Sequence, residues 1–287
     1  MRVFRLLLSL LNKYEFGKTA IAFVKKVVGM DQHFGISSIN VAKSFPIYWP
    51  GSAGTYHSIS KQAILAIRET IPLLANFVKE DEKVVSISDY TKRFVSVNDQ
   101  ILGDLLCFYG SDKSTNHNYH IVYAHILGEP EKIKKIFEIG LGTNNTSINS
   151  NMGATGKPGA SSRAFRDYLP NAIVYGADID REILFEENRI FTHYLDQTDS
   201  KSFDALELSM SGDFDLMIDD GLHSINANLR SLNFFLSKLR KGGFAVIEDI
   251  PEWSIDFWFL VPRLISPVFE STIVRTKNSY LFVVEKL

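Results

Sequence analysis

Short apolar runs that end in polar or acidic residues recur through the second half of the chain. Five of them cover residues 134–139, 172–178, 190–195, 214–219 and 244–249. Runs of this length, bounded by glycine, asparagine and aspartate, are typical of buried strands. Between them lie segments with apolar residues at three- and four-residue steps, such as 224–240, which predict helices. This alternation predicts an α/β fold with a Rossmann-like, doubly wound and mostly parallel sheet.

The end of the chain has a different pattern. Residues 268–276 and 280–285 are two β-rich runs, and Lys277, Asn278 and Ser279 join them. So short a connection between two strand-like runs predicts a β-hairpin. We therefore expect the parallel sheet to finish in an antiparallel hairpin, which a plain dinucleotide-binding domain does not have.

The first third of the chain carries helical patterns but no cluster of reactive side chains. Residues 58–79 have a clear amphipathic pattern, and residues 1 to about 30 have a second one that is rich in basic residues. The basic helix packs on its own domain or on a second subunit, or it makes a weak membrane-surface contact. We expect a mainly helical accessory region over residues 1–105, serving as a lid, a substrate contact or a homo-oligomer contact. The sheet would occupy residues 106–287.

Charge and cysteine content exclude several classes of protein. The chain has 287 residues and a formal net charge of -2, so no global basic excess indicates a nucleic-acid partner. Its single cysteine, Cys107, allows neither an intramolecular disulfide nor a cysteine zinc site. No segment reaches the roughly 18 consecutive apolar residues of a membrane span. We expect a cytoplasmic protein whose partner is a small molecule or a glycan.

A glycine-rich turn follows the first of the five predicted strands. In open α/β sheets, ligands bind at the carboxyl ends of the strands. Gly140 and Gly142 would let the backbone approach such a ligand and direct its N–H groups at it. The third glycine of the dinucleotide fingerprint is absent, because Asn145 stands in its place. The sequence therefore argues against a bound pyrophosphate.

Polar side chains at the first three strand ends are candidates for binding a nucleoside. Glu138, inside the first strand, would contact a ligand or fix the glycine turn. Asp178 ends the second strand, where an acid accepts the ribose hydroxyls of NAD and S-adenosylmethionine alike, or caps the next element. Asp196 and Gln197 end the third strand, where an adenine edge could be recognised.

Four carboxylates stand at the ends of the fourth and fifth strands, namely Asp219, Asp220, Glu248 and Asp249. Carboxylates this close repel each other unless a positive charge lies among them or some are protonated. A hard divalent cation, Mg²⁺ above all, is the simplest solution, whereas helix capping explains only one of the four. His223 follows Asp220 by three residues and can act as a general base on a hydroxyl, or as a structural histidine.

Together these motifs resemble a known family. Glu138-x-Gly140-x-Gly142, Asp178, Ile218-Asp219-Asp220-Gly221-x-His223 and Glu248-Asp249 are similar to class I S-adenosylmethionine-dependent methyltransferases. More narrowly, they resemble the metal-dependent sugar O-methyltransferases of mycinamicin and macrocin biosynthesis. The elements Gly110-Ser111-Asp112-Lys113 and Lys157-Pro158-Gly159-Ala160-Ser161 also resemble that group and related bacterial polysaccharide-locus proteins. The resemblance covers about residues 106–287.

The resemblance implies a role for each strand end. S-adenosylmethionine would lie against Glu138, Gly140, Gly142, Asp178, Asp196 and Gln197, with Asp219 near its methionine end. Mg²⁺ would be held by Asp220, Glu248 and Asp249. His223 would be the general base, so that Asp220 and His223 carry the transfer of a methyl group to a sugar hydroxyl.

Three other functions are compatible with parts of the pattern. The acceptor could be a phosphoramidate or a small phenol instead of a sugar. An NAD-dependent oxidoreductase is disfavoured by the missing third glycine and the final hairpin. A non-catalytic subunit that keeps the cofactor fold is disfavoured by the intact acids and His223.

Overall fold

The computed structural model describes residues 70–75 and 84–287. The chain divides into two compact units, Met1–Phe77 and Val78–Leu287. Within the first unit, residues 70–75 are helical, inside the helix predicted over 58–79. The predicted basic helix and its membrane-surface contact lie outside the described residues. In the described part of the chain, no helix is both long and apolar enough to cross a membrane.

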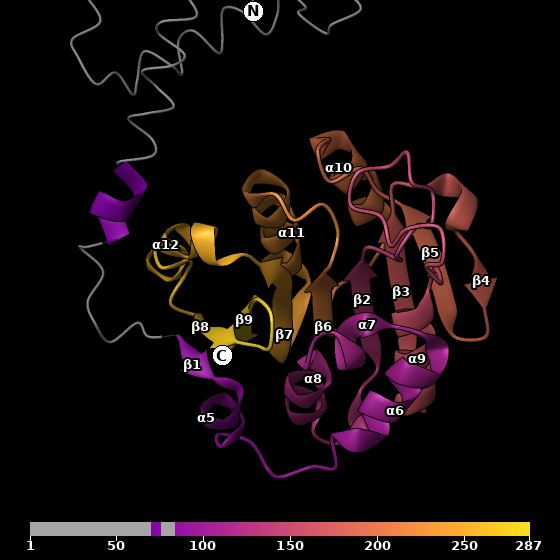
Figure 1. The fold of residues 1–287 in the computed structure, drawn as a ribbon, viewed down its shortest axis with the longest axis horizontal. Helices are drawn as coiled ribbons and strands as arrows, with labels where there is room; N and C mark the ends of the chain where they lie inside the picture. The colour runs from indigo at the N-terminus through magenta and orange to yellow at the C-terminus, as the bar shows by residue number, and fades with distance from the viewer. Residues whose placement is uncertain (1–69, 76–83) are drawn as a thin grey trace, which may run out of the picture. The chain divides into compact units, whose positions relative to one another are not determined.

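A nine-stranded sheet forms the centre of the second unit (Figure 1). Its strands lie in the order β1 (Val85–Ser86), β8 (Phe269–Arg275), β9 (Tyr280–Lys286), β7 (Leu239–Ile250), β6 (Phe214–Asp219), β2 (Lys135–Ile139), β3 (Ile173–Asp178), β5 (Ile190–Tyr194) and β4 (Glu186–Glu187). The five strands from β7 to β5 are mutually parallel. β9 pairs antiparallel with both β7 and β8. The predicted Rossmann-like sheet with a C-terminal antiparallel hairpin is therefore confirmed.

Helices cover both faces of this sheet. They are α5 (Ile87–Thr91), α6 (Gln100–Tyr109), α7 (Asp112–Thr115), α8 (Tyr119–Leu127), α9 (Ala160–Tyr168), α10 (Ser200–Ser209), α11 (Ile225–Lys238) and α12 (Ile255–Trp258). Short 3₁₀ turns lie at Pro130–Lys132, Arg181–Ile183, Glu252–Ser254 and Val261–Arg263. The first four of these helices and α9 lie on one side of the sheet, and α10 and α11 lie on the other (Figure 1).

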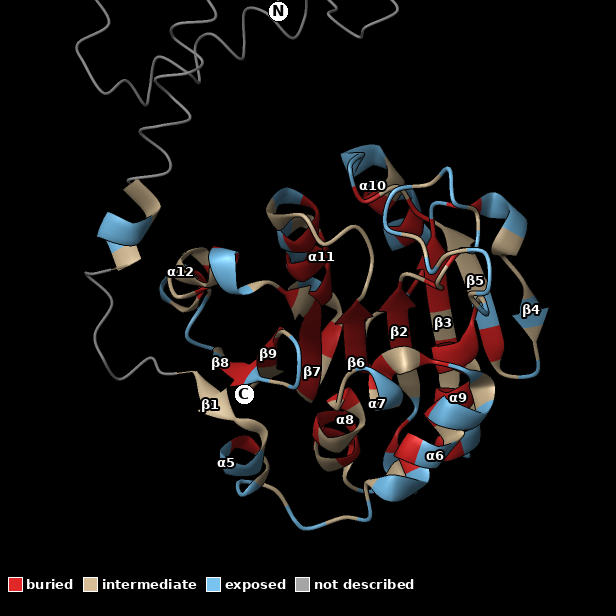
Figure 2. Cartoon of the chain, in the orientation of Figure 1, coloured by how far each residue is buried: buried red, intermediate tan, exposed pale blue. Residues whose placement is uncertain are grey.

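The hydrophobic core forms two layers, because successive strand residues point to opposite faces of a sheet. Ile136 and Leu216 pack in one layer with the buried side chains of α5, α6, α8 and α9. Phe137 and Met217, their neighbours in sequence, pack in the other layer with α10, α11 and α12. The central parallel strands β6 and β2 are buried along almost all of their length (Figure 2), as expected for a sheet covered on both faces. β5, nearer the edge of the sheet, is mostly half-buried or exposed.

Helix α6 crosses the domain boundary expected between residues 105 and 106. Its side chains Leu102 and Leu106 are fully buried and belong to the core of the sheet unit. Tyr90 of α5, also before the expected boundary, is buried in the same layer. Residues 84–105 thus pack with the sheet, because their apolar side chains complete one of its two covering layers.

A pair of glycines follows the helix predicted over 224–240. Helix α11 ends at Lys238, and Gly242 and Gly243 lie inside β7. The pairing of β6 and β7 shifts register between Phe214 and Leu216. A Cβ at Gly243 would lie 2.6 Å from the Phe214 carbonyl oxygen, so the glycine lets the two strands approach at this irregularity.

Asp215 joins the starts of three neighbouring strands and thereby aligns their ends. Its buried carboxylate accepts hydrogen bonds from the backbone N–H groups of Lys134 (2.7 Å) and Lys135 (2.9 Å), and from Arg240 Nε (2.5 Å). With this register, Asp219 lies opposite Ile139 on one side and Ile247 on the other. The polar residues that follow β2, β6 and β7 consequently meet at one edge of the sheet.

Candidate functional site

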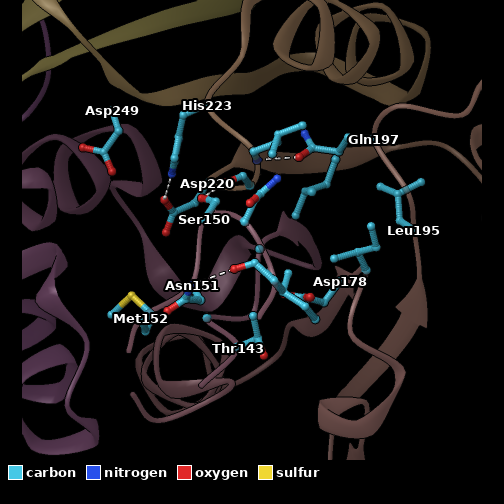
Figure 3. A pocket seen from close by; sticks show the side chains of 18 of the residues that line it. Thr143, Ser150, Asn151, Met152, Asp178, Leu195, Gln197, Asp220, His223 and Asp249 are labelled. Carbon is cyan, nitrogen blue, oxygen red and sulfur yellow. Dashed lines mark hydrogen bonds and ion pairs between the residues drawn. The ribbon is translucent and has the colours of Figure 1, made fainter. Parts of the chain in front are cut away.

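A cavity of about 390 Å³ lies at the carboxyl edge of the parallel strands, within the size range of small-molecule sites. Figure 3 shows side chains from several strand ends around it. The lining includes eight of the residues singled out from the sequence: Gly140, Gly142, Asp178, Asp196, Gln197, Asp220, His223 and Asp249. The rule that ligands bind at the carboxyl ends of the strands therefore located this cavity correctly.

The glycine turn after β2 approaches the end of β6 closely. Gly140 has φ +94°, and a Cβ there would lie 2.0 Å from the backbone oxygen of Asp220. The Asp220 N–H donates to the Ile139 carbonyl at 2.9 Å, which holds the two segments together. Gly142 has φ +80°, and a Cβ there would come within 3.0 Å of Met152. Only glycine fits this cradle without displacing the chain that carries Asp220.

Asp178 both lines the cavity and fixes the glycine turn. One carboxylate oxygen accepts from the N–H of Leu141 at 2.8 Å, and the other accepts from the N–H of Asp180 at 2.9 Å. Burial raises the pKa of this carboxyl group, and the backbone hydrogen bonds oppose that rise. The lone pairs of these two oxygens that accept no backbone hydrogen bond can accept one from a ligand.

Gln197 connects the end of β5 to the turn after β6. Its Nε2 donates to Asp219 Oδ1 and to Ser231 Oγ, both at 2.8 Å, and its Oε1 accepts from the N–H of Leu222 at 2.7 Å. The amide lines the cavity, but it is already hydrogen-bonded within the chain. In this structure Gln197 positions the turn that leads to His223.

Two residues expected to contact the cofactor, Glu138 and Asp219, do not line the cavity. Glu138 is fully buried and accepts from the hydroxyls of Ser161 (2.6 Å) and Ser162 (3.2 Å), which lie in α9. Burial raises the pKa of its carboxyl group. Its neighbours Phe137 and Ile139 face the other side of the sheet, so strand alternation directs Glu138 into the helix layer.

Asp219 is a structural carboxylate in the same way. It is fully buried, and besides Gln197 it accepts from Asn228 Nδ2 at 2.9 Å and from the N–H of Gly221 at 3.2 Å. These bonds tie the first part of α11 to the tight turn after β6. The next residue, Asp220, turns toward the cavity instead.

Asp220, His223 and Asp249 form the candidate metal centre. One potential ligand atom from each lies within 4.8 Å of the others. His223 Nε2 is 3.8 Å from Asp220 Oδ1, the contact dashed in Figure 3. His223 (φ +54°) and Asp249 (φ +53°) both adopt the left-handed conformation that only glycine takes readily. Strained backbone of this kind is concentrated at functional sites.

Hydrogen bonds to Asp249 fix it in the site. Its Oδ1 accepts from the hydroxyl of Tyr119 at 2.5 Å and from that of Ser279 at 3.3 Å. Burial tends to raise the pKa of the Asp249 carboxyl group, but the Tyr119 hydrogen bond and the nearby His223 and His117 lower it below its ordinary value. Asp249 is thus held as an anion, which suits a cation ligand.

Glu248, expected beside Asp249 among the metal ligands, lies outside this centre. It is buried and accepts hydrogen bonds from Lys113 Nζ at 2.5 Å and from the hydroxyl of Tyr123. Consecutive residues near the end of β7 point in different directions, so the chain presents Asp249 to the cavity and Glu248 to α7 and α8. The structure brings together two members of the expected metal set, Asp220 and Asp249.

The sequence did not reveal the role of Lys113. Its ammonium group lies 2.5 Å from Asp220 Oδ2, 2.5 Å from Glu248 Oε2 and 3.4 Å from Glu138 Oε1, and the side chain is only 2% exposed. Burial alone would lower the pKa of Lys113, but the carboxylates, Asp220 and Glu248 foremost, raise it well above its usual value. The one available signal was its place in the Gly110-Ser111-Asp112-Lys113 element.

Of the other histidines in the described part of the chain, His117 lies at the site. Its Nδ1 is 3.7 Å from Asp249 Oδ1, its Nε2 is 3.9 Å from Asp112 Oδ2, and its ring stacks on Tyr119. His120 and His193 do not line the cavity, and burial lowers the pKa of each. His117 therefore belongs to the surroundings of Asp249.

Parts of the chain are similar in sequence to known O-methyltransferases. No family model matches the chain. A stretch of 150 residues is 31% identical to the 8-demethyl-8-alpha-L-rhamnosyl tetracenomycin-C 2'-O-methyltransferase of Streptomyces olivaceus, covering 52% of this chain and 37% of that protein. A stretch of 93 residues is 39% identical to the mycinamicin VI 2''-O-methyltransferase of Micromonospora griseorubida, covering 32% and 23%. The chain spans less than two fifths of the curated relatives it matches.

The chain is also similar to a solved structure. The MycE methyltransferase of the mycinamycin pathway, in complex with Mg, SAH and mycinamycin VI, has a TM-score of 0.52 and 25% identity. The match covers 64% of this chain and 54% of that chain. The sheet unit has the methyltransferase fold. The expected resemblance to sugar O-methyltransferases is likewise confirmed.

Replacing Gly140 tests whether the glycine cradle depends on close backbone contact. Gly140→Ala should lower the free energy of unfolding by about 2 to 5 kcal/mol, since strain at positive φ adds to a clash with the Asp220 backbone. Gly153→Ala is the matched control, because Gly153 also has positive φ but a Cβ there would meet nothing within 4 Å. It should cost only about 1 to 2 kcal/mol. Urea unfolding measures both, and equal costs would contradict the close contact.

Proposed function

We propose that this chain transfers a methyl group from S-adenosylmethionine to a hydroxyl of a sugar or a glycosylated small molecule. The observation that carries the proposal is the position of Asp220, His223 and Asp249, which share one cavity with the glycine cradle. A cofactor site and an acid–histidine cluster that face each other are what metal-assisted O-methyl transfer requires. The relatives named as sugar O-methyltransferases support the acceptor class.

The cradle and the strand ends fit the cofactor. Gly140 and Gly142 leave space where side chains would otherwise stand, and Asp178 and Asp196 line the same cavity. Asp178 would accept hydrogen bonds from the ribose hydroxyls, as acids at this position do. When bound, S-adenosylmethionine supplies an electrophilic methyl group on its sulfonium. Glu138 and Asp219 act behind this surface by holding α9 and the turn after β6.

The acid–histidine cluster fits a divalent cation. Asp220 and Asp249 offer the carboxylate oxygens that Mg²⁺ prefers, and His223 adds a third donor within reach. A cation held there would polarise the acceptor hydroxyl as a Lewis acid. Asp220 and Asp249 would therefore bind this cation and in that way orient the acceptor hydroxyl.

His223 is the group that we assign to proton removal. Its ring lines the cavity beside Asp220, and its side chain is partly exposed. Its buried Nδ1 has no hydrogen-bond partner among the described residues. A neutral imidazole near pH 7 accepts a proton from a hydroxyl as the oxygen becomes a nucleophile.

A second cavity of about 490 Å³ supports a sugar acceptor. It shares Asp112, Asn151 and Met152 with the first cavity, so the two are adjacent. Hydroxyl and amide side chains dominate the rest of its lining: Ser111, Thr115, Asn116 and Thr155. Groups of this kind suit the hydroxyls of a sugar better than a phenol ring. Homo-oligomer formation, a cytoplasmic location and the absence of a nucleic-acid partner remain predictions.

The activity can be tested with methyl-labelled S-adenosylmethionine and a panel of sugars and glycosides. We expect labelled methyl ethers to form with Mg²⁺, to disappear with EDTA and to return when Mg²⁺ is restored. Calorimetry should show binding of S-adenosylmethionine but not of NAD. Binding of NAD alone would favour an oxidoreductase. Binding of S-adenosylmethionine without any methylated product would favour a non-catalytic subunit. Methyl transfer that persists in EDTA would show that the reaction needs no divalent cation.

His223→Gln distinguishes a general base from a metal ligand. We expect kcat to fall by about 10² to 10⁴ at the Mg²⁺ concentration that saturates the unsubstituted protein, because no group remains to accept the proton. The affinity for S-adenosylmethionine should stay within about threefold of the unsubstituted protein. Recovery of kcat when Mg²⁺ is raised further would show that His223 acts as a ligand, and an unchanged kcat would exclude both roles.

The second cavity predicts an effect on acceptor binding alone. Asn116→Ala combined with Thr115→Val should raise the KM for the sugar acceptor by about tenfold, since two lost hydrogen bonds cost about 1 to 3 kcal/mol. The affinity for S-adenosylmethionine should not change. Asp204→Asn, at an exposed position of α10, is the control. An unchanged KM in the double variant would place the acceptor elsewhere.

A further inference from the structure

Three residues line both the cavity at the glycine cradle and the second cavity, namely Asp112, Asn151 and Met152. Methyl transfer requires the acceptor oxygen to lie about 3 to 3.5 Å from the methyl carbon and in line with the bond that breaks. A cofactor in the first cavity and an acceptor in the second can therefore react only where the two cavities meet. The side chains shared by both cavities are those next to the reacting hydroxyl.

Met152 is the apolar member of this set, and core packing does not account for its position. Its side chain is 43% exposed and is not part of either layer of the hydrophobic core. Figure 3 shows its thioether among the side chains that surround the cavity. Methionine is unbranched and polarisable, so it packs well against irregular apolar surfaces. The exposed thioether is thus available for contact with the carbon atoms of a ligand.

Two glycines leave the space that the Met152 side chain occupies. A Cβ at Gly142 would lie 3.0 Å from Met152 Cγ, and a Cβ at Gly156 would lie 2.5 Å from Met152 Cβ. A side chain at Gly156 would displace the methionine or the chain that carries it. The thioether therefore fits between the glycine cradle on one side and the backbone at Gly156 on the other.

Hydrogen bonds hold the backbone that carries Met152. The Met152 N–H donates to the Thr143 carbonyl at 2.8 Å, which attaches this segment to the glycine turn. The Asn151 side chain closes the neighbouring turn. Its Nδ2 donates to the Ile148 carbonyl at 2.6 Å, and its Oδ1 accepts from the Gly153 N–H at 2.9 Å. None of these bonds uses the Met152 side chain, so replacing that side chain leaves them in place.

We propose that Met152 is a specificity-determining residue, whose side chain limits the size of the substituent that the acceptor carries next to its reacting hydroxyl. The inference rests on the proposed function, because it assumes a cofactor at the glycine cradle and an acceptor in the second cavity. A sugar presents C–H groups beside its hydroxyls, and the thioether gains dispersion contacts with them. A larger substituent at the same place would overlap with the methionine.

Matched pairs of acceptors test this proposal on the purified full chain. Each pair is a methyl glycoside that the unsubstituted protein methylates, and the same glycoside with an ethoxy group next to the reacting hydroxyl. In Met152→Ala the ratio of the two kcat/KM values should shift by about tenfold or more toward the ethoxy compound, as for small size differences in an apolar pocket. Met152→Leu, of similar volume, should keep the ratio within about threefold. Leu208→Ala, at a 92% exposed position of α10 outside both cavities, is the control and should change neither constant.

Cys107 offers a second measurement that does not depend on turnover. It is the only cysteine of the chain and lines the second cavity. A glycoside bound there should therefore slow the alkylation of Cys107 by iodoacetamide. In Met152→Ala, the concentration of the ethoxy glycoside that halves the alkylation rate should fall by about tenfold. Binding of S-adenosylhomocysteine, measured by calorimetry, should change by less than about threefold, which also shows that the variant is folded.

The results distinguish a failure of this inference from a failure of the proposed function. If the unsubstituted protein methylates no glycoside and none protects Cys107, the proposed function fails and this inference fails with it. If it methylates glycosides, and Met152→Ala keeps the same ratio between the paired acceptors, only the role of Met152 is overturned. Tenfold weaker binding of S-adenosylhomocysteine in Met152→Ala, with that ratio unchanged, would make Met152 a cofactor contact and overturn the inference too.

Discussion

The candidate site depends on one buried ammonium group placed among carboxylates. Sheet pairing brings the ends of β2, β6 and β7 together and so crowds Glu138, Asp220 and Glu248. Without a positive charge, this edge would carry several buried anions at close range, which is strongly unfavourable. Lys113 supplies that charge from α7, a helix outside the sheet.

The direction in which each side chain leaves its strand end decides which acids face the cavity. Asp219 and Asp220 are adjacent, yet the first is buried in hydrogen bonds and the second lines the cavity. Glu248 and Asp249 divide in the same way at the end of β7, where Asp249 adopts a strained backbone conformation. Pairs of acids therefore serve two purposes: one member stabilises the turn or helix behind the site, and the other faces the cavity.

The sequence predicted much of this fold because the fold depends on local patterns. Apolar runs marked the parallel strands, the Lys277–Ser279 connection marked the final hairpin, and acids at strand ends marked the cavity. It assigned Glu138 and Asp219 to the cofactor because a linear pattern shows that an acid ends a strand but not which face it takes. It missed the role of Lys113 because its two nearest partners, Asp220 and Glu248, lie 107 and 135 residues away. A contact over such a separation follows from tertiary packing alone.

The most direct test of the account is a crystal structure of the chain with Mn²⁺ and S-adenosylhomocysteine, in which anomalous scattering locates the metal. The account predicts an anomalous peak within coordination distance of Asp220 and Asp249, with S-adenosylhomocysteine against the turn at Gly140. An anomalous peak away from these strand ends, or S-adenosylhomocysteine bound outside this cavity, would contradict the central claim that one edge of the sheet holds both the cation and the cofactor.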